Sequence, residues 1–457
     1  MTESNRLLVF VTAAALGLLA ARPTRAQAPS GPGPERGAEP LDAALKRTFV
    51  PLAVPAALYE PISRGERTST AVFVMHASQS YITHSACTEL SKRGYTVLCA
   101  GSSSQELLDR KLLEVKSAVT YLRQLPGIRK VILFGHSGGG TLMTAYQLVA
   151  ENGPRACQGA EKLVKCPDDL TGLPRADGII LADSNWGNAV MALFSLDPAV
   201  VSNDSGTTVN PDLDLWNPKN GFSPAGSTYS PEFIRTFQRA VGKRETALIR
   251  MASERLAAVE AGKGRFLDDE PFVVAGGGSM GPNNKLFAQD PRLMSHTRKA
   301  WPLLHAGGSV TQEVVHSVRV PQGARSLTPN LAMGALNTTV RGFLTNSAVR
   351  VSEDFGFDES TVRGVDWTST YSCPPGNVEQ ISVPLLVMGM TAGWEYLAAE
   401  TIYENAKSPD KSLAFVDGAT HGFFPCAQCE KTPGQFGDTI KTLYDYVDTW
   451  LSRRARF

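Results

Sequence analysis

The segment Arg129–Val149 limits the fold of this chain most strongly, because it requires a β-strand that turns at once into a helix. The apolar, β-branched run Val131–Phe134 predicts a buried strand, and apolar residues at helical spacing follow it within a few positions. The central residue of so sharp a turn, Ser137, must take up a strained backbone conformation. Its neighbours two positions away have to be small, and they are Gly135 and Gly139.

A short G-x-S-x-G motif arises by chance in many loops, but a buried strand before it and an amphipathic helix after it make the signal specific. In that setting the serine hydroxyl lies above the edge of the sheet, at the N-terminus of a helix. We therefore predict that Ser137 is a catalytic nucleophile. The alternative is a glycine-rich turn that carries no chemistry.

Strand and helix signals alternate on both sides of this turn, and the strands are apolar throughout, without a period of two. Such strands are buried on both faces, which predicts an α/β fold with a mostly parallel, doubly wound sheet. Strands are expected at residues 70–75, 95–100, 131–134, 178–182, 383–388 and 412–416, and helices at residues 82–93, 107–125, 395–406 and 436–451.

The alternation stops at about residue 185 and resumes after residue 376, which predicts one large insertion and not a second tandem domain. The insertion leaves the sheet beside Ser137, so we expect a mainly helical cap over the site. Ser230 and Pro231 begin a long helix in it, with the hydroxyl as N-cap and proline at the first helical position. The expected division is a signal peptide (1–26), a disordered linker (27–47), the first part of the core (48–184), the cap (185–376) and the second part of the core (377–457).

The N-terminal residues have the pattern of an export signal. Arg6 precedes the apolar run Leu7–Ala20, which is too short for a membrane span, and Thr24-Arg25-Ala26 supplies small residues for a signal peptidase. We predict cleavage after Ala26 and a periplasmic or extracellular protein. An uncleaved N-terminal anchor is the alternative.

Seven cysteines fit an exported protein, in which close pairs form disulfides. Cys157–Cys166 is the first candidate pair. Cys426–Cys429 is the second, as a strained bridge or a redox pair; as half a zinc site it lacks a partner pair at metal spacing. Cys87 and Cys99 lie in apolar runs and are expected to be buried free thiols. The odd number leaves at least one thiol unpaired.

A serine nucleophile needs a base within hydrogen-bonding reach and an acid that orients the base. Of the seven histidines, His421 follows the last predicted strand, in a loop that can return over the sheet to Ser137. We predict that His421 is the general base. His136 and His76 are expected to be packing residues at the ends of their strands.

This arrangement resembles the α/β-hydrolase superfamily, and the resemblance covers residues 49–451 apart from the cap. It implies the chain order serine, acid, histidine, of which the first and last members are already placed. It also implies an oxyanion hole, with one donor from the N–H of Gly138. The second N–H would come from the loop after the strand at 70–75, where Ser78 is the best match and Ala77 the next.

The acid is where this chain departs from the family pattern. In the family the acid usually follows the strand that here ends at Gly389, in a Gly-Thr-Ala-Asp type of segment, and this chain has Gly393 in place of the aspartate. Glu395 follows two residues later with a longer side chain that can reach the same place, and we favour it. Asp183, at the end of the strand at 178–182, is the alternative, a position that some lipases of the superfamily use.

Serine at the nucleophile position argues against the dehalogenase and epoxide-hydrolase branches of the superfamily, which carry aspartate there. We therefore expect a secreted carboxylic-ester hydrolase that forms an acyl-enzyme. Amide, lactone or carbon–carbon bond hydrolysis uses the same triad and stays open. A non-catalytic binding protein on a hydrolase scaffold also stays open.

Hydrophobic residues make up 42% of the chain and charged residues 19%, as in soluble globular proteins, and the net charge of +1 comes without a dense basic run that would indicate nucleic-acid binding. The sequence has no phosphate loop, dinucleotide fingerprint or metal-spaced cluster, so no cofactor and no metal is expected. The oligomeric state is left open. Some aromatic residues of the cap should face the site and would favour an apolar or aromatic ester, whereas most are expected to form the core of the cap: Trp216, Phe222, Phe233, Phe237, Phe272, Trp301, Phe343 and Trp367.

Overall fold

The computed structural model describes residues 41–103, 107–201, 208–278, 285–321, 334–453 and 456–457. The signal peptide expected at 1–26 and residues 27–40 of the expected linker lie outside the described residues. The linker was expected to extend to residue 47, but the first strand already begins at Leu45.

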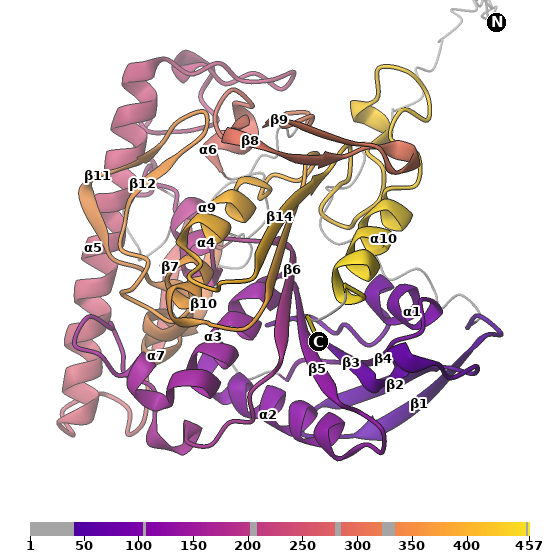
Figure 1. Ribbon diagram of the computed structural model, residues 1–457. Helices are drawn as coiled ribbons and strands as arrows, with labels where there is room; N and C mark the ends of the chain where they lie inside the picture. Colours follow the sequence, from indigo (N-terminus) through magenta and orange to yellow (C-terminus); the bar gives the residue numbers. More distant parts are fainter. Residues whose placement is uncertain (1–40, 104–106, 202–207, 279–284, 322–333, 454–455) are drawn as a thin grey trace, which may run out of the picture.

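Among the described residues, the central sheet has ten strands (Figure 1). In spatial order they are β1 (Leu45–Pro51), β2 (Pro55–Pro61), β4 (Thr96–Ala100), β3 (Thr70–Val74), β5 (Lys130–Ser137), β6 (Gly178–Ser184), β13 (Leu385–Met390), β14 (Lys411–Val416), β8 (His296–Leu304) and β9 (Val310–His316). The strands from β4 to β8 run parallel, whereas β1, β2 and β9 are antiparallel to their neighbours. The predicted α/β fold class with a mostly parallel sheet is confirmed.

Helices cover both faces of this sheet. One face carries α1 (Ser85–Lys92) and α10 (Thr439–Leu451), and the other carries α2 (Leu108–Gln124), α3 (Gly138–Asn152) and α9 (Leu397–Asn405). Within β3, Val72 and Val74 pack toward α1 and α10, whereas Ala71 and Phe73 pack toward α2 and α3. Burial on both faces explains why these strands show no period of two in the sequence.

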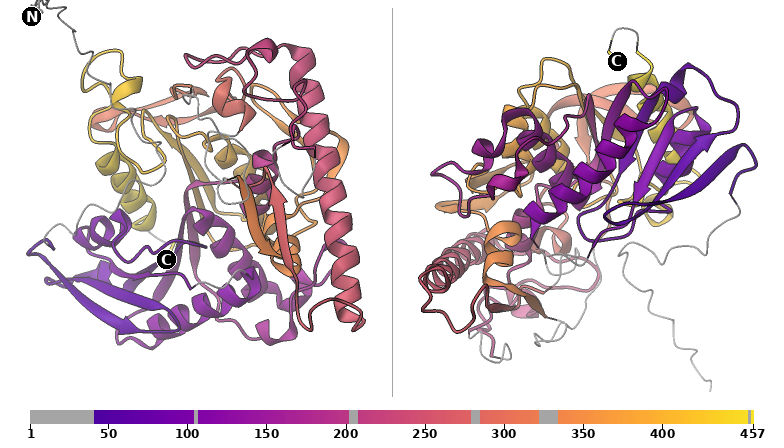
Figure 2. Two further views of the ribbon diagram at one scale, coloured as in Figure 1. Left: turned by 180° about the vertical axis from the view of Figure 1, so that it is seen from behind. Right: turned by 90° about the horizontal axis from the view of Figure 1, so that it is seen from below.

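The insertion between β6 and β13 contains a long helix, as the sequence predicted. The Ser230 hydroxyl caps this helix by accepting a hydrogen bond of 3.1 Å from the Phe233 N–H. The helices of the insertion include α4 (Asn188–Ser195), α5 (Pro231–Glu260), α6 (Leu286–Gln289), α7 (Val340–Gly342) and α8 (Pro374–Asn377). The long helix α5 runs along the side of the molecule opposite β1 and β2 (Figures 1 and 2).

The expectation of a mainly helical cap is incomplete, because the described part of the insertion also forms strand pairs. β7 (Pro271–Ala275) pairs with β10 (Ala335–Thr339), and β11 (Val351–Phe357) pairs with β12 (Val362–Val365). β8 and β9 instead join the central sheet, where Leu303 lies beside Phe415 of β14. The insertion therefore supplies a partner for the open edge of β14, whose backbone groups need one.

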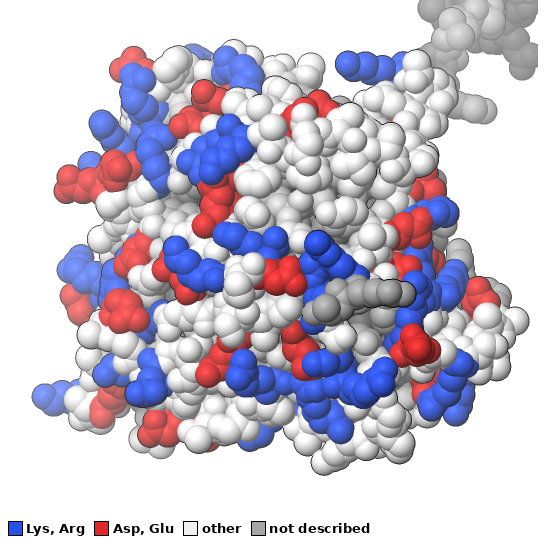
Figure 3. Space-filling view, in the orientation of Figure 1, with Lys and Arg blue, Asp and Glu red and all other residues white. Residues whose placement is uncertain are grey.

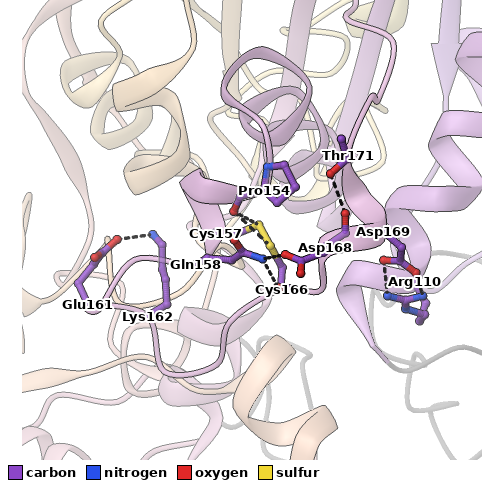
Figure 4. The surroundings of a disulfide bond; sticks show 10 residues. All are labelled: Arg110, Pro154, Cys157, Gln158, Glu161, Lys162, Cys166, Asp168, Asp169 and Thr171. Atoms are coloured by element: carbon purple, nitrogen blue, oxygen red, sulfur yellow. Dashed lines mark hydrogen bonds and ion pairs between the residues drawn. A yellow bond between two sulfur atoms is a disulfide. The ribbon is translucent and has the colours of Figure 1, made fainter.

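The two disulfides predicted from close cysteine pairs are present. Cys157–Cys166 closes the loop after α3, and Figure 4 shows the Gln158 side chain reaching both the Cys166 carbonyl and Asp168 beside it. Cys426–Cys429 closes a short turn beyond His421.

A third disulfide corrects the expectation that Cys87 and Cys99 are free thiols, because the structure joins them. Cys87 lies on α1, which packs directly on β4, so the two Cα atoms are 6.1 Å apart and within reach of a disulfide. The sequence showed that both residues are buried but not that they face each other. Cys373 is buried and unpaired.

Within the described ranges, no helix is both long and apolar enough to cross a membrane. On the face shown in Figure 3, basic and acidic side chains are interspersed and neither sign forms a continuous field.

Candidate active site

Ser137 occupies the sharp turn between β5 and α3 that the sequence predicted. Its backbone has φ 54° and ψ −130°, a conformation that residues with a side chain rarely adopt. A Cβ atom on Gly135 would lie 2.8 Å from the Gly139 carbonyl group, and one on Gly139 would lie 2.6 Å from the Met75 carbonyl oxygen. Both glycines of the motif are therefore required, because the start of α3 packs against the ends of β5 and β3.

His421 and Asp183 form a direct hydrogen bond. The His421 Nδ1–H donates to Asp183 Oδ2 over 2.7 Å, and the other carboxylate oxygen accepts a bond of 3.0 Å from the Met390 N–H. The Asp183 side chain is fully buried. With the proton held on Nδ1, the Nε2 atom of neutral His421 is free to act as a base.

A local irregularity in β6 places Asp183 beside the sharp turn between β5 and α3. His136 pairs with Ala182 and Ser137 pairs with Ser184, so Asp183 is skipped in the register and takes a φ of 46°. An extra residue in a strand re-aims its side chain, and aspartate tolerates positive φ better than most residues. Ser137 and Asp183 thus leave the carboxyl ends of two adjacent parallel strands.

Glu395, the acid favoured from the sequence, is close to this pair but does not bond His421. Its Oε2 atom is buried without a hydrogen-bond partner among the described residues. Burial raises the pKa of Glu395 to about 7, and the charge of Asp183 acts in the same direction, against the opposing charges of His421 and Lys285. The geometry therefore corrects the preference for Glu395 and selects the alternative, Asp183, as the partner of His421.

The space around Gly393 explains why this chain has no acidic side chain at the position where the family usually has the acid. A Cβ atom on Gly393 would lie 2.8 Å from Asp183 Oδ2, so the Asp183 carboxylate occupies the space that a side chain at residue 393 would need. Glycine at residue 393 was thus the sequence signal for an acid on β6. The signal can be interpreted only when it is known that residues 183 and 393 lie side by side in the fold.

The charges around His421 act on its basicity. Burial by itself would lower the pKa of His421, but the carboxylates of Glu395 and Asp183 together raise it to about 9.

His136, expected only to pack, also holds the backbone of the His421 loop. Its Nε2–H donates a bond of 2.7 Å to the His421 carbonyl oxygen, so its Nδ1 accepts one of 2.7 Å from the Tyr81 hydroxyl. This role could not be predicted, because nothing close to His136 in the sequence indicates where the His421 loop returns.

The expected oxyanion donors are only partly available. Gly138 is the first residue of α3, where the backbone N–H groups of a helix are without intrahelical partners. The Ser78 N–H, expected as the second donor, instead donates to His76 Nδ1 over 3.0 Å. For Ala77, the next match, the described residues offer no hydrogen-bond partner to the N–H.

In the part of the chain that the structure describes, no group of three or more histidine, cysteine, aspartate or glutamate side chains could hold a metal ion.

The strand order, the serine at the elbow after β5, and the acid and histidine that follow it in the chain agree with the arrangement inferred from sequence. The fold is that of the α/β-hydrolases. No protein-family model and no curated protein sequence matches this chain.

Solved structures similar to this chain have very different sequences. A hypothetical protein PA2218 from Pseudomonas aeruginosa is 12% identical, with a TM-score of 0.41 over 90% of this chain and 95% of that chain. The α/β-hydrolase GrgF from Penicillium sp. sh18 is 12% identical, with a TM-score of 0.40 over 90% of this chain and 100% of that chain. Est1E from Butyrivibrio proteoclasticus is 10% identical, with a TM-score of 0.36 over 89% and 97%. Similarity at this level says nothing about substrate.

Proposed function

We propose that this protein is an exported serine hydrolase that cleaves carboxylic esters through an acyl-enzyme. The observation that carries the proposal is the 2.7 Å bond between His421 Nδ1 and Asp183 Oδ2, at the end of the strand adjacent to the one that ends at Ser137, whose φ is 54°. A base oriented by a buried acid, beside a strained serine, is what nucleophilic acyl transfer requires.

In the proposed reaction, Ser137 Oγ attacks the ester carbonyl carbon while His421 Nε2 takes the hydroxyl proton. Asp183 stabilises the resulting imidazolium through the bond to Nδ1, and the carbonyl oxygen, now negative, is bound by the Gly138 N–H. Collapse of the tetrahedral intermediate breaks the bond to the alcohol, which leaves with the proton from His421. A water molecule then repeats the sequence on the acyl-enzyme and releases the acid.

The test is hydrolysis of aryl esters of graded acyl length by the mature protein and by Ser137→Ala. We expect turnover by the wild type and none by the variant, because the attacking oxygen is gone. Labelling by a serine-reactive phosphonate separates the alternatives: a label on Ser137 without ester turnover moves the proposal to amides, lactones or carbon–carbon bonds, which use the same groups. Neither label nor turnover would favour a binding protein on a hydrolase scaffold.

Export is part of the proposal. The N-terminal signal pattern up to Ala26 supports it, as do the three disulfides, since disulfides form and persist in oxidising compartments. Expression of the full chain in a bacterial host with mass analysis of the periplasm and medium tests it. We expect a mature N-terminus at Gln27; recovery of the intact chain in the cytoplasm would contradict export.

A further inference from the structure

The ring of His76 is held in one protonation state and one orientation. Its Nδ1 atom accepts two backbone N–H bonds, from Ser78 over 3.0 Å and from Gln79 over 3.1 Å, so the single proton of the neutral ring is on Nε2. Tyr81 stacks on the ring with 4.9 Å between centroids. Burial lowers the pKa of His76 to about 3, with help from the charges of His421, His84 and Lys111, so the ring stays neutral.

The Nε2 atom of His76 lies beside Gly138, the residue expected to supply the first oxyanion donor. A Cβ atom on Gly138 would lie 3.1 Å from His76 Nε2 and 3.3 Å from Cε1, so the nitrogen is next to the residue that supplies the first oxyanion donor. The Asn188 Oδ1 atom borders the same space at 3.1 Å from that Cβ position. None of the described residues forms a hydrogen bond with His76 Nε2, so its proton is available to a ligand.

Of the two backbone donors expected opposite Gly138, the Ser78 N–H is engaged, whereas the Ala77 N–H has no partner among the described residues. Ser78 N–H is directed at the His76 ring and cannot also bind an oxyanion. A tetrahedral intermediate needs at least two preorganised donors about 3 Å from its oxygen. The bond from the Ser78 N–H to His76 Nδ1 has two effects. It engages the Ser78 N–H, and it keeps the proton of the neutral His76 ring on Nε2.

We propose that the His76 side chain is a catalytic residue of the proposed ester hydrolysis, and that its Nε2–H takes the place of the Ser78 N–H as a donor of the oxyanion hole. This inference rests on the proposed function. A neutral imidazole suits the task because it donates one hydrogen bond in a fixed direction without losing its proton to the reacting groups.

Two substitutions separate this role from support of the turn. In His76→Asn the amide oxygen can replace Nδ1 as acceptor for the Ser78 and Gln79 N–H groups, but no donor reaches the Nε2 position. In His76→Gln the amide NH₂ can reach the Nε2 position, but the acceptor at Nδ1 is lost. We expect kcat/KM to fall about 100- to 1000-fold in His76→Asn, as for loss of one oxyanion donor, with KM little changed.

His76→Gln should retain at least tenfold more activity than His76→Asn. The opposite ranking, with Asn near the wild type and Gln impaired, would overturn the proposal and assign His76 to the turn. Circular dichroism and thermal unfolding of each variant check that it is folded.

A second measurement on the wild type does not depend on the variants. With ¹⁵N-labelled histidine, the Nε2–H resonance of His76 should move downfield when a phosphonate on Ser137 places its phosphoryl oxygen in the oxyanion hole. If the phosphonate has reacted completely with Ser137 and the resonance does not move, the role of His76 is overturned, whereas the proposed ester hydrolysis is not. A wild type that neither hydrolyses esters nor takes the label would instead remove the proposed function, and with it this role.

Discussion

Two buried carboxylates, Asp183 and Glu395, lie beside His421, but they meet it in different ways. Asp183 accepts the Nδ1–H bond and a second bond from the Met390 N–H, so both its oxygens are satisfied. Glu395 has an oxygen without a partner among the described residues and acts on His421 through its charge. One acid therefore orients the base, and the other changes its basicity.

Asp183→Asn should remove most of the activity. Asparagine at this position can hold the wrong tautomer of His421, with the proton on Nε2, and loss of the corresponding aspartate in a Ser-His-Asp triad lowers kcat on the order of 10⁴-fold. Glu395→Gln keeps the shape and should lower kcat/KM at its optimum pH by less than about tenfold. Steady-state kinetics on the best ester decide between them, and equal losses in the two variants would contradict the assignment of the acid.

Glu395→Gln should also move the pH profile. The neutral form of His421 is the base, so kcat/KM rises as the pH rises through the pKa of His421. The Glu395 carboxylate raises that pKa, so its removal should shift the rising limb to lower pH. Profiles from pH 5 to 10 measure the shift, with Glu254→Gln on the exposed face of α5 as control. An unchanged or upward-shifted limb would show that Glu395 does not act on His421.

At the level of elements, the strand-to-helix elbow depends on how closely α3 approaches β3. A Cβ atom on Gly139 would lie 2.6 Å from the Met75 carbonyl oxygen, and backbone on both sides leaves little room to yield. Gly139→Ala should lower the stability by about 1–3 kcal/mol, as overpacking does elsewhere, and should displace Ser137 enough to remove most activity.

Urea unfolding and ester kinetics on Gly139→Ala measure both effects. Gly65→Ala is the matched control, because a Cβ atom there meets nothing within 4 Å and the backbone φ is −134°. Wild-type activity in Gly139→Ala would mean that the elbow adapts more freely than its geometry indicates.

The elements near the site were largely predictable, because each is set by local sequence. The run Val131–Phe134, the glycines around Ser137 and the hydroxyl cap at Ser230 act within one or two turns of chain. The strands of the insertion were not predictable in the same way. β8 is polar and half-exposed over much of its length, and its strand conformation comes from pairing with β9 and, at Leu303 and Leu304, with β14.

At the scale of the whole molecule, a chain of aromatic ring contacts that begins at His421 joins the core to the insertion. The Trp394 ring is 6.1 Å from His421 and stacks at 6.4 Å on Phe287 of α6, which in turn contacts Phe357 of β11. Trp394 is half-buried beside the proposed base, so we expect it to contact the acyl or alcohol group. Removing the whole insertion would not test this, because β8 and β9 would be lost from the central sheet.

Trp394→Ala should change the preference among esters more strongly than it lowers the rate on a small ester. We expect the ratio of kcat/KM for an aromatic or long-chain ester to that for an acetyl ester to fall at least about tenfold, since apolar contacts in a pocket discriminate at that scale. Trp216→Ala, in the insertion and packed on Phe222, is the control and should leave the ratio unchanged. Equal losses on both esters in Trp394→Ala would place this ring outside the substrate site.

Six parallel strands of the sheet, the sharp turn at Ser137, the position of His421 after a predicted strand and two of the three disulfides could be predicted from the sequence. Each of these depends on periodicity or on residues close together in the chain. The acid that bonds His421 became clear only from the packing, since Asp183 reaches His421 through a skipped residue in β6, and its carboxylate fills the space beside Gly393. The packing likewise decided the Cys87–Cys99 bond and the orientation of His76. These contacts join segments whose distance in space is set by the packing of the sheet, which no local pattern records.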